Sequence, residues 1–203
     1  MASYKTSRML PTILTVIVII GAIIGLVALA RALFFSGSTS NAPATNYVAV
    51  ARENLLSTTD GSAVSMTVRG PIVADENFRS YQITVSPNER KVQTFKGYLD
   101  TTIDQQTLGN NLAAYEQFVF ALDKANMATG RQLDEEKNDV RGICATGRVY
   151  EFKVIKAGEV TQTLWTSTCS GSNGSLRANV TQLTQLFTSQ VPDAQALIRP
   201  LSI

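Results

Sequence analysis

The residues that most often carry catalysis are scarce in this chain. Its 203 residues include no histidine, and histidine is both the commonest general base and the commonest metal ligand. This excludes a Ser-His-Asp or Cys-His mechanism. Ser170 and Ser175 have no lysine at the spacing of a catalytic pair, and the chain contains no phosphate-binding loop, dinucleotide glycine motif or nucleophile elbow.

Two groups of carboxylates remain as candidate general acids and bases. Asp75 and Glu76 are adjacent, and Asp134, Glu135 and Glu136 form a second group in a polar stretch. Such residues exchange protons with a substrate when they face each other across a cleft. The polar stretch lacks the regular oxygen spacing and the central glycine of an EF-hand calcium loop. We therefore expect solvated surface residues, and we predict neither a metal nor a cofactor.

The two cysteines, Cys144 and Cys169, predict a disulfide bond. An even number of cysteines in an oxidising compartment is typical of disulfide pairing. Two buried thiols are the alternative. A zinc site is excluded because the chain lacks the further ligands that such a site needs.

A β-hairpin would bring these cysteines together. Residues 149–156 (VYEFKVIK) alternate apolar and polar side chains, residues 159–169 are rich in β-branched side chains, and Ala157-Gly158 joins them. A two-residue loop that ends in glycine is typical of a hairpin. If Lys156 pairs with Glu159, the numbers of any two residues that face each other in the hairpin add up to 315. The numbers of the two cysteines add up to 313, so the cysteines are within a two-residue slip of facing each other. A longer turn or one bulge would close this gap and bring the Cα atoms to the roughly 5–6 Å that a disulfide needs.

The rest of the domain reads as further strands and two amphipathic helices. Residues 47–57 fit a short helix or a strand equally well. An α+β domain follows, because helices interrupt an antiparallel sheet without strict βαβ alternation. The apolar tail up to Ile203 is expected to pack back on the domain. Strands are expected at 63–69, 79–86 and 90–98, and the first of them is expected to continue at 72–74. Helices are expected at 110–127 and 176–191. Asn110 or Asn111 is expected to cap the first helix, and Gly130 to lie near its end.

Trp165 and two asparagines are further candidate binding or modification sites. Trp165, the sole tryptophan, follows Leu164 and must point to the opposite face of its strand. A buried anchor on the helix-covered side is favoured over an exposed binding aromatic. Asn173 and Asn179 match the N-glycosylation pattern, which has a consequence only in a host that glycosylates.

An uncharged run of 21 residues, from Leu10 to Ala30, predicts a transmembrane helix. A helix of this length covers roughly 30 Å, the thickness of the hydrocarbon core of a bilayer. Leu33, Phe34 and Phe35 extend the apolar character, so we place the span at 10–35. Cleavage of a signal peptide after Ala30 is the alternative, but signal-peptide apolar regions are typically about 7–15 residues long.

The flanking charges orient this span. Lys5 and Arg8 precede it without any acid, which predicts a cytoplasmic N-terminus at 1–9 and an extracytoplasmic location for everything after the span. Residues 36–45 (SGSTSNAPAT) are typical of a flexible linker. The domain at 46–203 then holds 15 basic and 16 acidic residues, since Lys5, Arg8 and Arg31 belong to the anchor. This balance gives no indication of nucleic-acid binding.

We therefore expect a non-catalytic, membrane-anchored binding, scaffolding or assembly protein of the cell envelope, with the bilayer and an envelope protein as its partners. A pilin-like or secretion-filament subunit is the first alternative, because it shares the order of basic leader, apolar helix and α+β head. Its motif, however, needs Gly or Ala before the apolar run and Glu at the fifth position, and residues 9–11 are Met-Leu-Pro. An enzyme that uses carboxylates only is the second alternative.

Overall fold

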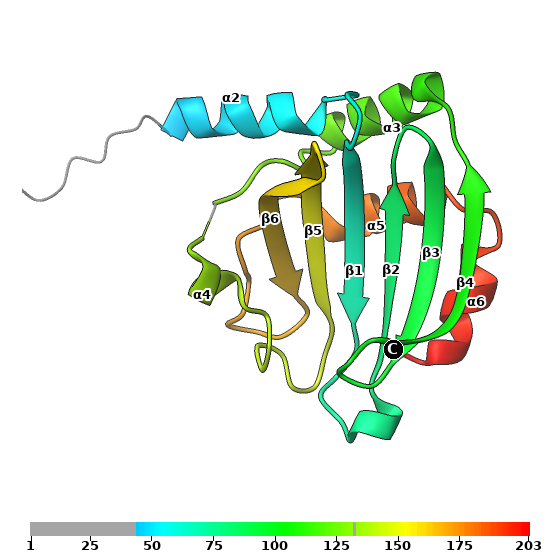
Figure 1. The fold of residues 1–203 in the computed structure, drawn as a ribbon. Coiled ribbons are helices and arrows are strands. Elements are labelled where there is room, and N and C mark those ends of the chain that lie inside the picture. The colour runs from blue at the N-terminus through cyan, green and yellow to red at the C-terminus, as the bar shows by residue number, and fades with distance from the viewer. Residues whose placement is uncertain (1–43, 132) are drawn as a thin grey trace, which may run out of the picture. The chain divides into compact units, whose positions relative to one another are not determined.

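The computed structural model describes residues 44–131 and 133–203 (Figure 1). The predicted span at 10–35, the N-terminal segment before it and most of the predicted linker lie outside these residues. In the described part of the chain, no helix has the length and apolar character needed to cross a bilayer.

A six-stranded antiparallel sheet in the order β4-β3-β2-β1-β5-β6 is the framework of the molecule. With its helices it confirms the predicted α+β class. The three predicted N-terminal strands and the C-terminal hairpin all form, within two residues of the expected ends. The strands are β1 (Ala63–Arg69), β2 (Arg79–Val85), β3 (Glu89–Lys96), β4 (Thr101–Gly109), β5 (Val149–Lys156) and β6 (Glu159–Ser167).

One face of the sheet carries the main hydrophobic core. Alternate strand residues such as Val64 and Met66 point to this face and are fully buried. Helices α3 (Leu112–Lys124) and α5 (Val180–Thr188) cover it, and α5 lies behind the sheet in Figure 1. Phe187 of α5 is the centre of an aromatic cluster, because its ring centroid lies 5.3 Å from that of Phe118 and 6.0 Å from that of Phe152.

Helix α2 (Ala44–Leu55) resolves the ambiguity at 47–57 in favour of a helix. Ala51 and Leu55 lie one turn apart on its buried face, which is the helical period. Arg52 donates to both carboxylate oxygens of Asp123 in α3, at 2.7 and 2.8 Å. The helix begins two residues before the predicted end of the linker.

The ends of α3 are only partly as predicted. Asn111 is the N-cap, and its side chain accepts a hydrogen bond from the Ala114 amide at 2.9 Å. The helix ends at Lys124, however, because Asn126 adopts a left-handed conformation (φ 61°) and directs the chain away. Gly130 instead forms an isolated bridge with Leu176, where a β-carbon would collide with the carbonyl oxygen of Ser175.

The second predicted helix is shorter than expected. Leu176 is taken up by the bridge to Gly130, so α5 starts only at Val180, with Asn179 as a cap that accepts from the Gln182 amide at 3.0 Å. The tail packs back as predicted. It forms α6 (Ala194–Ile198) and η2 (Arg199–Leu201), and Leu201 is buried.

Strand β4 was missed by the sequence prediction. It is an edge strand of nine residues, TTIDQQTLG, and most of its side chains are exposed. Without a buried face there is no selection for apolar alternation, so the pattern that identifies other strands is lacking. Conversely, residues 72–74 do not continue β1 after Gly70-Pro71 but form an irregular segment.

Candidate functional site

The second face of the sheet is polar, and part of it is roofed by the chain between α3 and β5. Ser65, Thr67 and Arg69 of β1 point to this face, together with Val149 and Glu151 of β5, because Arg69 pairs with Val149 and Thr67 with Glu151. Residues 138–144, which start at the last residue of the short helix α4 (Glu135–Asn138), face this surface across a pocket. Helix α4 itself contacts β6.

This pocket has a volume of about 660 Å³, and we call it the sheet pocket. Its size is that of a small-molecule or peptide side-chain site. A backbone hydrogen bond from the Ile72 amide to the Ala145 carbonyl, 2.8 Å long, joins two of its walls. Apolar side chains provide much of the lining: Ile72, Phe78, Tyr98, Val140, Ile143 and Val149.

An aromatic pair forms one wall. The rings of Phe78 and Tyr98 are stacked, with centroids 4.2 Å apart. The Tyr98 hydroxyl donates to the Val73 carbonyl at 2.7 Å and accepts from the Val73 amide at 3.2 Å. The Tyr98 amide donates to Oδ1 of Asp75 at 2.8 Å. Asp75, a candidate acid or base from the sequence, therefore serves to position this wall.

Charged residues also line the pocket. Nη1 of Arg69 lies 3.7 Å from Oδ1 of Asp100, close enough for charge attraction but too far for a hydrogen bond. Nε of Arg69 is buried and has no hydrogen-bond partner among the described residues. Glu151 keeps only 8% of its side-chain area exposed and forms an ion pair with Lys153 at 2.7 Å.

Asp139, on the roof of the pocket, is held in its ionised form. Hydrogen bonds from the Arg141 side chain and backbone amide lower the pKa of Asp139 to about 2. Nε of Arg141 donates to Oδ2 of Asp139 at 2.8 Å. A carboxyl group with so low a pKa is not protonated near neutral pH. It is also a poor general base, because efficient proton transfer requires a pKa near the working pH.

Of the other acidic candidates from the sequence, Glu76, Asp134 and Glu136 do not line the pocket. Glu76 and Glu136 are exposed, and Asp134 is exposed and pairs with Lys137 at 3.2 Å. Glu135 is the first residue of α4. The described residues contain no group of three or more acidic or cysteine side chains that could hold a metal ion.

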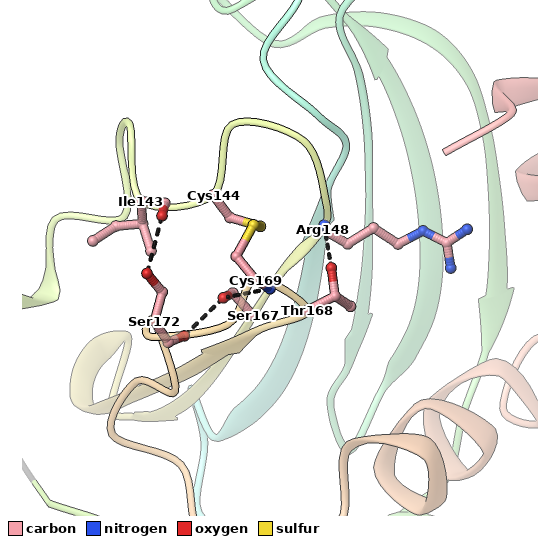
Figure 2. Close-up of a disulfide and its surroundings, with 7 residues drawn as sticks. All are labelled: Ile143, Cys144, Arg148, Ser167, Thr168, Cys169 and Ser172. Carbon is pink, nitrogen blue, oxygen red and sulfur yellow. Dashed lines mark hydrogen bonds between the residues drawn. A yellow bond between two sulfur atoms is a disulfide. The ribbon is translucent and has the colours of Figure 1, made fainter.

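The predicted disulfide between Cys144 and Cys169 is confirmed, with Cα atoms 5.5 Å apart (Figure 2). The explanation by register needs a correction. The turn pairs Lys156 with Glu159 as predicted, but the bulge in the hairpin raises the sum of opposed numbers to 316, away from 313. The gap is closed instead by residues 145–147, which bend out of the strand and carry Cys144 over the end of β6.

Hydrogen bonds around the disulfide fix the roof of the pocket to the hairpin (Figure 2). Ser172 Oγ donates to the Ile143 carbonyl at 3.2 Å, and the Arg148 amide donates to Thr168 Oγ1 at 2.9 Å. Cys144 and Ile143 both line the sheet pocket. The disulfide therefore anchors one wall of the pocket.

Trp165 is buried, with 6% of its area exposed, as favoured from the sequence. It lies on the polar face, opposite Leu164 and beside Glu151, and not on the helix-covered side as expected. Ser175 is a structural residue, because its Oγ accepts a hydrogen bond from the Trp165 amide at 3.1 Å. Ser170 and Asn173 are exposed turn residues.

Sequence reasoning missed the residues that make the pocket polar, namely Arg69, Asp100 and Glu151. The alternation in 63–69 and 149–156 placed Arg69 and Glu151 on the polar faces of their strands. It could not show that β1 and β5, far apart in sequence, are neighbours. Asp100 stands in a left-handed turn (φ 52°) before the strand that was missed.

Searches of protein-family models, of curated proteins and of solved structures found no match to this chain.

Proposed function

We propose that this chain is a single-pass membrane protein whose domain at 46–203 lies outside the cell membrane and binds another envelope component in the sheet pocket without catalysing a reaction. The apolar run at 10–30 and the basic residues before it support the anchor and its orientation. The disulfide fits an oxidising compartment.

The observation that carries the binding function is the composition of the sheet pocket. An apolar wall with a stacked aromatic pair shares the pocket with a few polar groups, which is the usual make-up of a ligand site. Two of the three carboxylates in its wall, Asp139 and Glu151, are engaged by Arg141 and Lys153. They are therefore suited to holding structure and charge balance more than to transferring protons.

Topology is tested with protease added to intact cells. The domain should be removed and a small membrane-bound fragment should remain. Protection of the domain until the cells are lysed would refute the orientation. An N-terminus that begins at Arg31 in the mature protein would refute the anchor and favour a cleaved signal peptide.

Binding in the pocket is tested by photo-crosslinking in living cells. A photo-reactive amino acid replaces Ile72, which lines the pocket and is 46% exposed, or Phe120, which lies on α3 outside it and is 50% exposed. The matched exposure makes Phe120 a control for random collisions. We expect a discrete adduct from position 72 only. Equal labelling at both positions, or none at position 72, would contradict binding at this site.

A further inference from the structure

The chemistry of the ligand can be inferred from Arg69, whose hydrogen-bonding groups are unused. An arginine side chain has five N–H donors in a planar fork. The Arg69 side chain forms no hydrogen bond to any described residue, and among these residues its buried Nε has no partner. Its one ionic neighbour, Asp100, is 3.7 Å away. Burying such a donor without a partner is costly, so a ligand that supplies an acceptor gains a corresponding advantage.

The other charged groups of the pocket are already paired, which limits the charge that a ligand can bring. Arg141 is bound to Asp139, and Lys153 to Glu151. Of the two described arginines that line the pocket, Arg69 is the one without a hydrogen-bonded carboxylate, and Asp100 lies 3.7 Å from it. The Arg69–Asp100 pair is neutral, so a ligand with one negative charge meets less repulsion from the neighbouring carboxylates than a phosphate dianion does.

The apolar lining determines the rest of the ligand. The stacked Phe78 and Tyr98 rings and the aliphatic side chains of Ile72, Ile143 and Val149 line the same space as Arg69. They favour a hydrophobic or aromatic group attached close to the anion, since apolar surface gains from being removed from water. A small hydrophilic anion would leave this surface unused.

We propose that the sheet pocket binds a carboxylate attached directly to an apolar group, with the Arg69 guanidinium holding the carboxylate and the Phe78–Tyr98 wall holding the apolar part. A planar guanidinium matches the two oxygens of a carboxylate. This inference rests on the proposed binding function. The same chemistry is supplied by the carboxyl terminus of a polypeptide that ends in an apolar residue and by a free fatty acid.

The test is equilibrium dialysis of the full chain in lipid nanodiscs, with empty nanodiscs as background. The probes are N-acetyl-phenylalanine, its uncharged carboxamide, octanoate and inorganic phosphate. At least one of the two apolar acids should be retained at least tenfold more tightly than the carboxamide. Retention of only the first acid would identify a polypeptide terminus, and retention of only octanoate would identify a fatty acid. Equal binding of acid and carboxamide, no binding of either acid, or tighter binding of phosphate would overturn the proposal.

Two variants give effects of defined sign, and a third is their control. Arg69→Gln should weaken retention of the acid at least tenfold, because a charged hydrogen-bonded pair is lost. Asp100→Asn should strengthen it severalfold, because a competing carboxylate next to Arg69 is removed. Arg177→Gln changes net charge by the same amount at an exposed position outside the pocket and should have no effect. Weaker binding in Asp100→Asn, or the same loss in Arg177→Gln, would contradict the assignment.

The two proposals fail separately. If position 72 gives an adduct in cells but acids and carboxamide bind alike, binding at the pocket stands and the carboxylate assignment is wrong. If position 72 gives no adduct but the acid is retained through Arg69, the pocket binds such acids and its proposed envelope partner is wrong.

Discussion

Replacing Cys144 and Cys169 together by alanine should lower the free energy of unfolding by roughly 3–5 kcal/mol. The two residues are 25 positions apart. In the chain-entropy model, closing a loop of this length removes about 12 cal/mol/K from the unfolded state, or about 3.5 kcal/mol at 25 °C. Because Cys144 is 2% exposed, the loss of its buried sulfur adds roughly 1 kcal/mol.

The native fold should survive this change. The hydrogen bonds from Ser172 to Ile143 and from Arg148 to Thr168 do not involve the sulfur atoms and still hold the end of the hairpin. The cost is therefore expected mainly in the unfolded state, which becomes more expanded when the crosslink is absent. The denaturant dependence of unfolding should steepen accordingly.

Guanidinium and thermal unfolding of the oxidised wild type and of the double variant measure this difference. For a domain of this size each kcal/mol corresponds to about 2–4 °C, so the melting temperature should fall by roughly 6–20 °C. A reducing agent should lower the stability of the wild type and leave the variant unchanged, which serves as the control. A loss below about 1 kcal/mol would refute the entropic argument.

Three further changes test other parts of the structure. Ala157→Gly should stabilise the domain by roughly 0.5–1 kcal/mol in thermal unfolding, because Ala157 has a positive φ (53°) in the hairpin turn; a loss would contradict this. Trp165→Ala should cost about 3–5 kcal/mol, whereas Trp165→Phe should cost about 2 kcal/mol or less, because the buried indole Nε1 has no hydrogen-bond partner among the described residues; equal losses would show that Nε1 does bind a partner. Hydrogen bonds from Arg52 lower the pKa of Asp123. Wild type should therefore be more stable than Asp123→Asn by the full amount above about pH 4, and this difference should disappear as the pH falls through the lowered pKa. A difference in stability that persists in strong acid would contradict the pairing.

Local patterns in the sequence were enough to predict the strands that bury one face and the hairpin turn. Residues 63–69 and 149–156 alternate because one side of each faces the core, and Ala157-Gly158 forms the two-residue turn that their spacing demands. Where burial does not impose a period, prediction failed. Strand β4 is exposed, and its threonines and glutamines carry no periodic pattern.

The candidate site was harder to predict than the fold because its parts come from separate segments. Acidic residues that are adjacent in sequence, such as Asp134 and Glu136, drew attention but lie outside the pocket. Arg69, Asp100 and Glu151 are isolated in sequence and meet only through strand pairing and turns. The pairing of β1 with β5 depends on the whole sheet, and no local pattern specifies it.

The order of strands in the sheet also has a kinetic consequence. Four of its five ladders join strands that follow each other along the chain, and only the β1–β5 ladder joins distant ones. Its nearest pair, Arg69 with Val149, closes a loop of about 80 residues, for which the length-dependent entropy is about 4 kcal/mol. The meander and the hairpin can thus form early from local contacts, and their docking along β1 and β5 should limit the folding rate. Because the Cys144–Cys169 bond encloses the hairpin alone, it does not shorten that loop. It acts on the hairpin, which has already formed when the two parts dock, so oxidation should speed folding more than it slows unfolding.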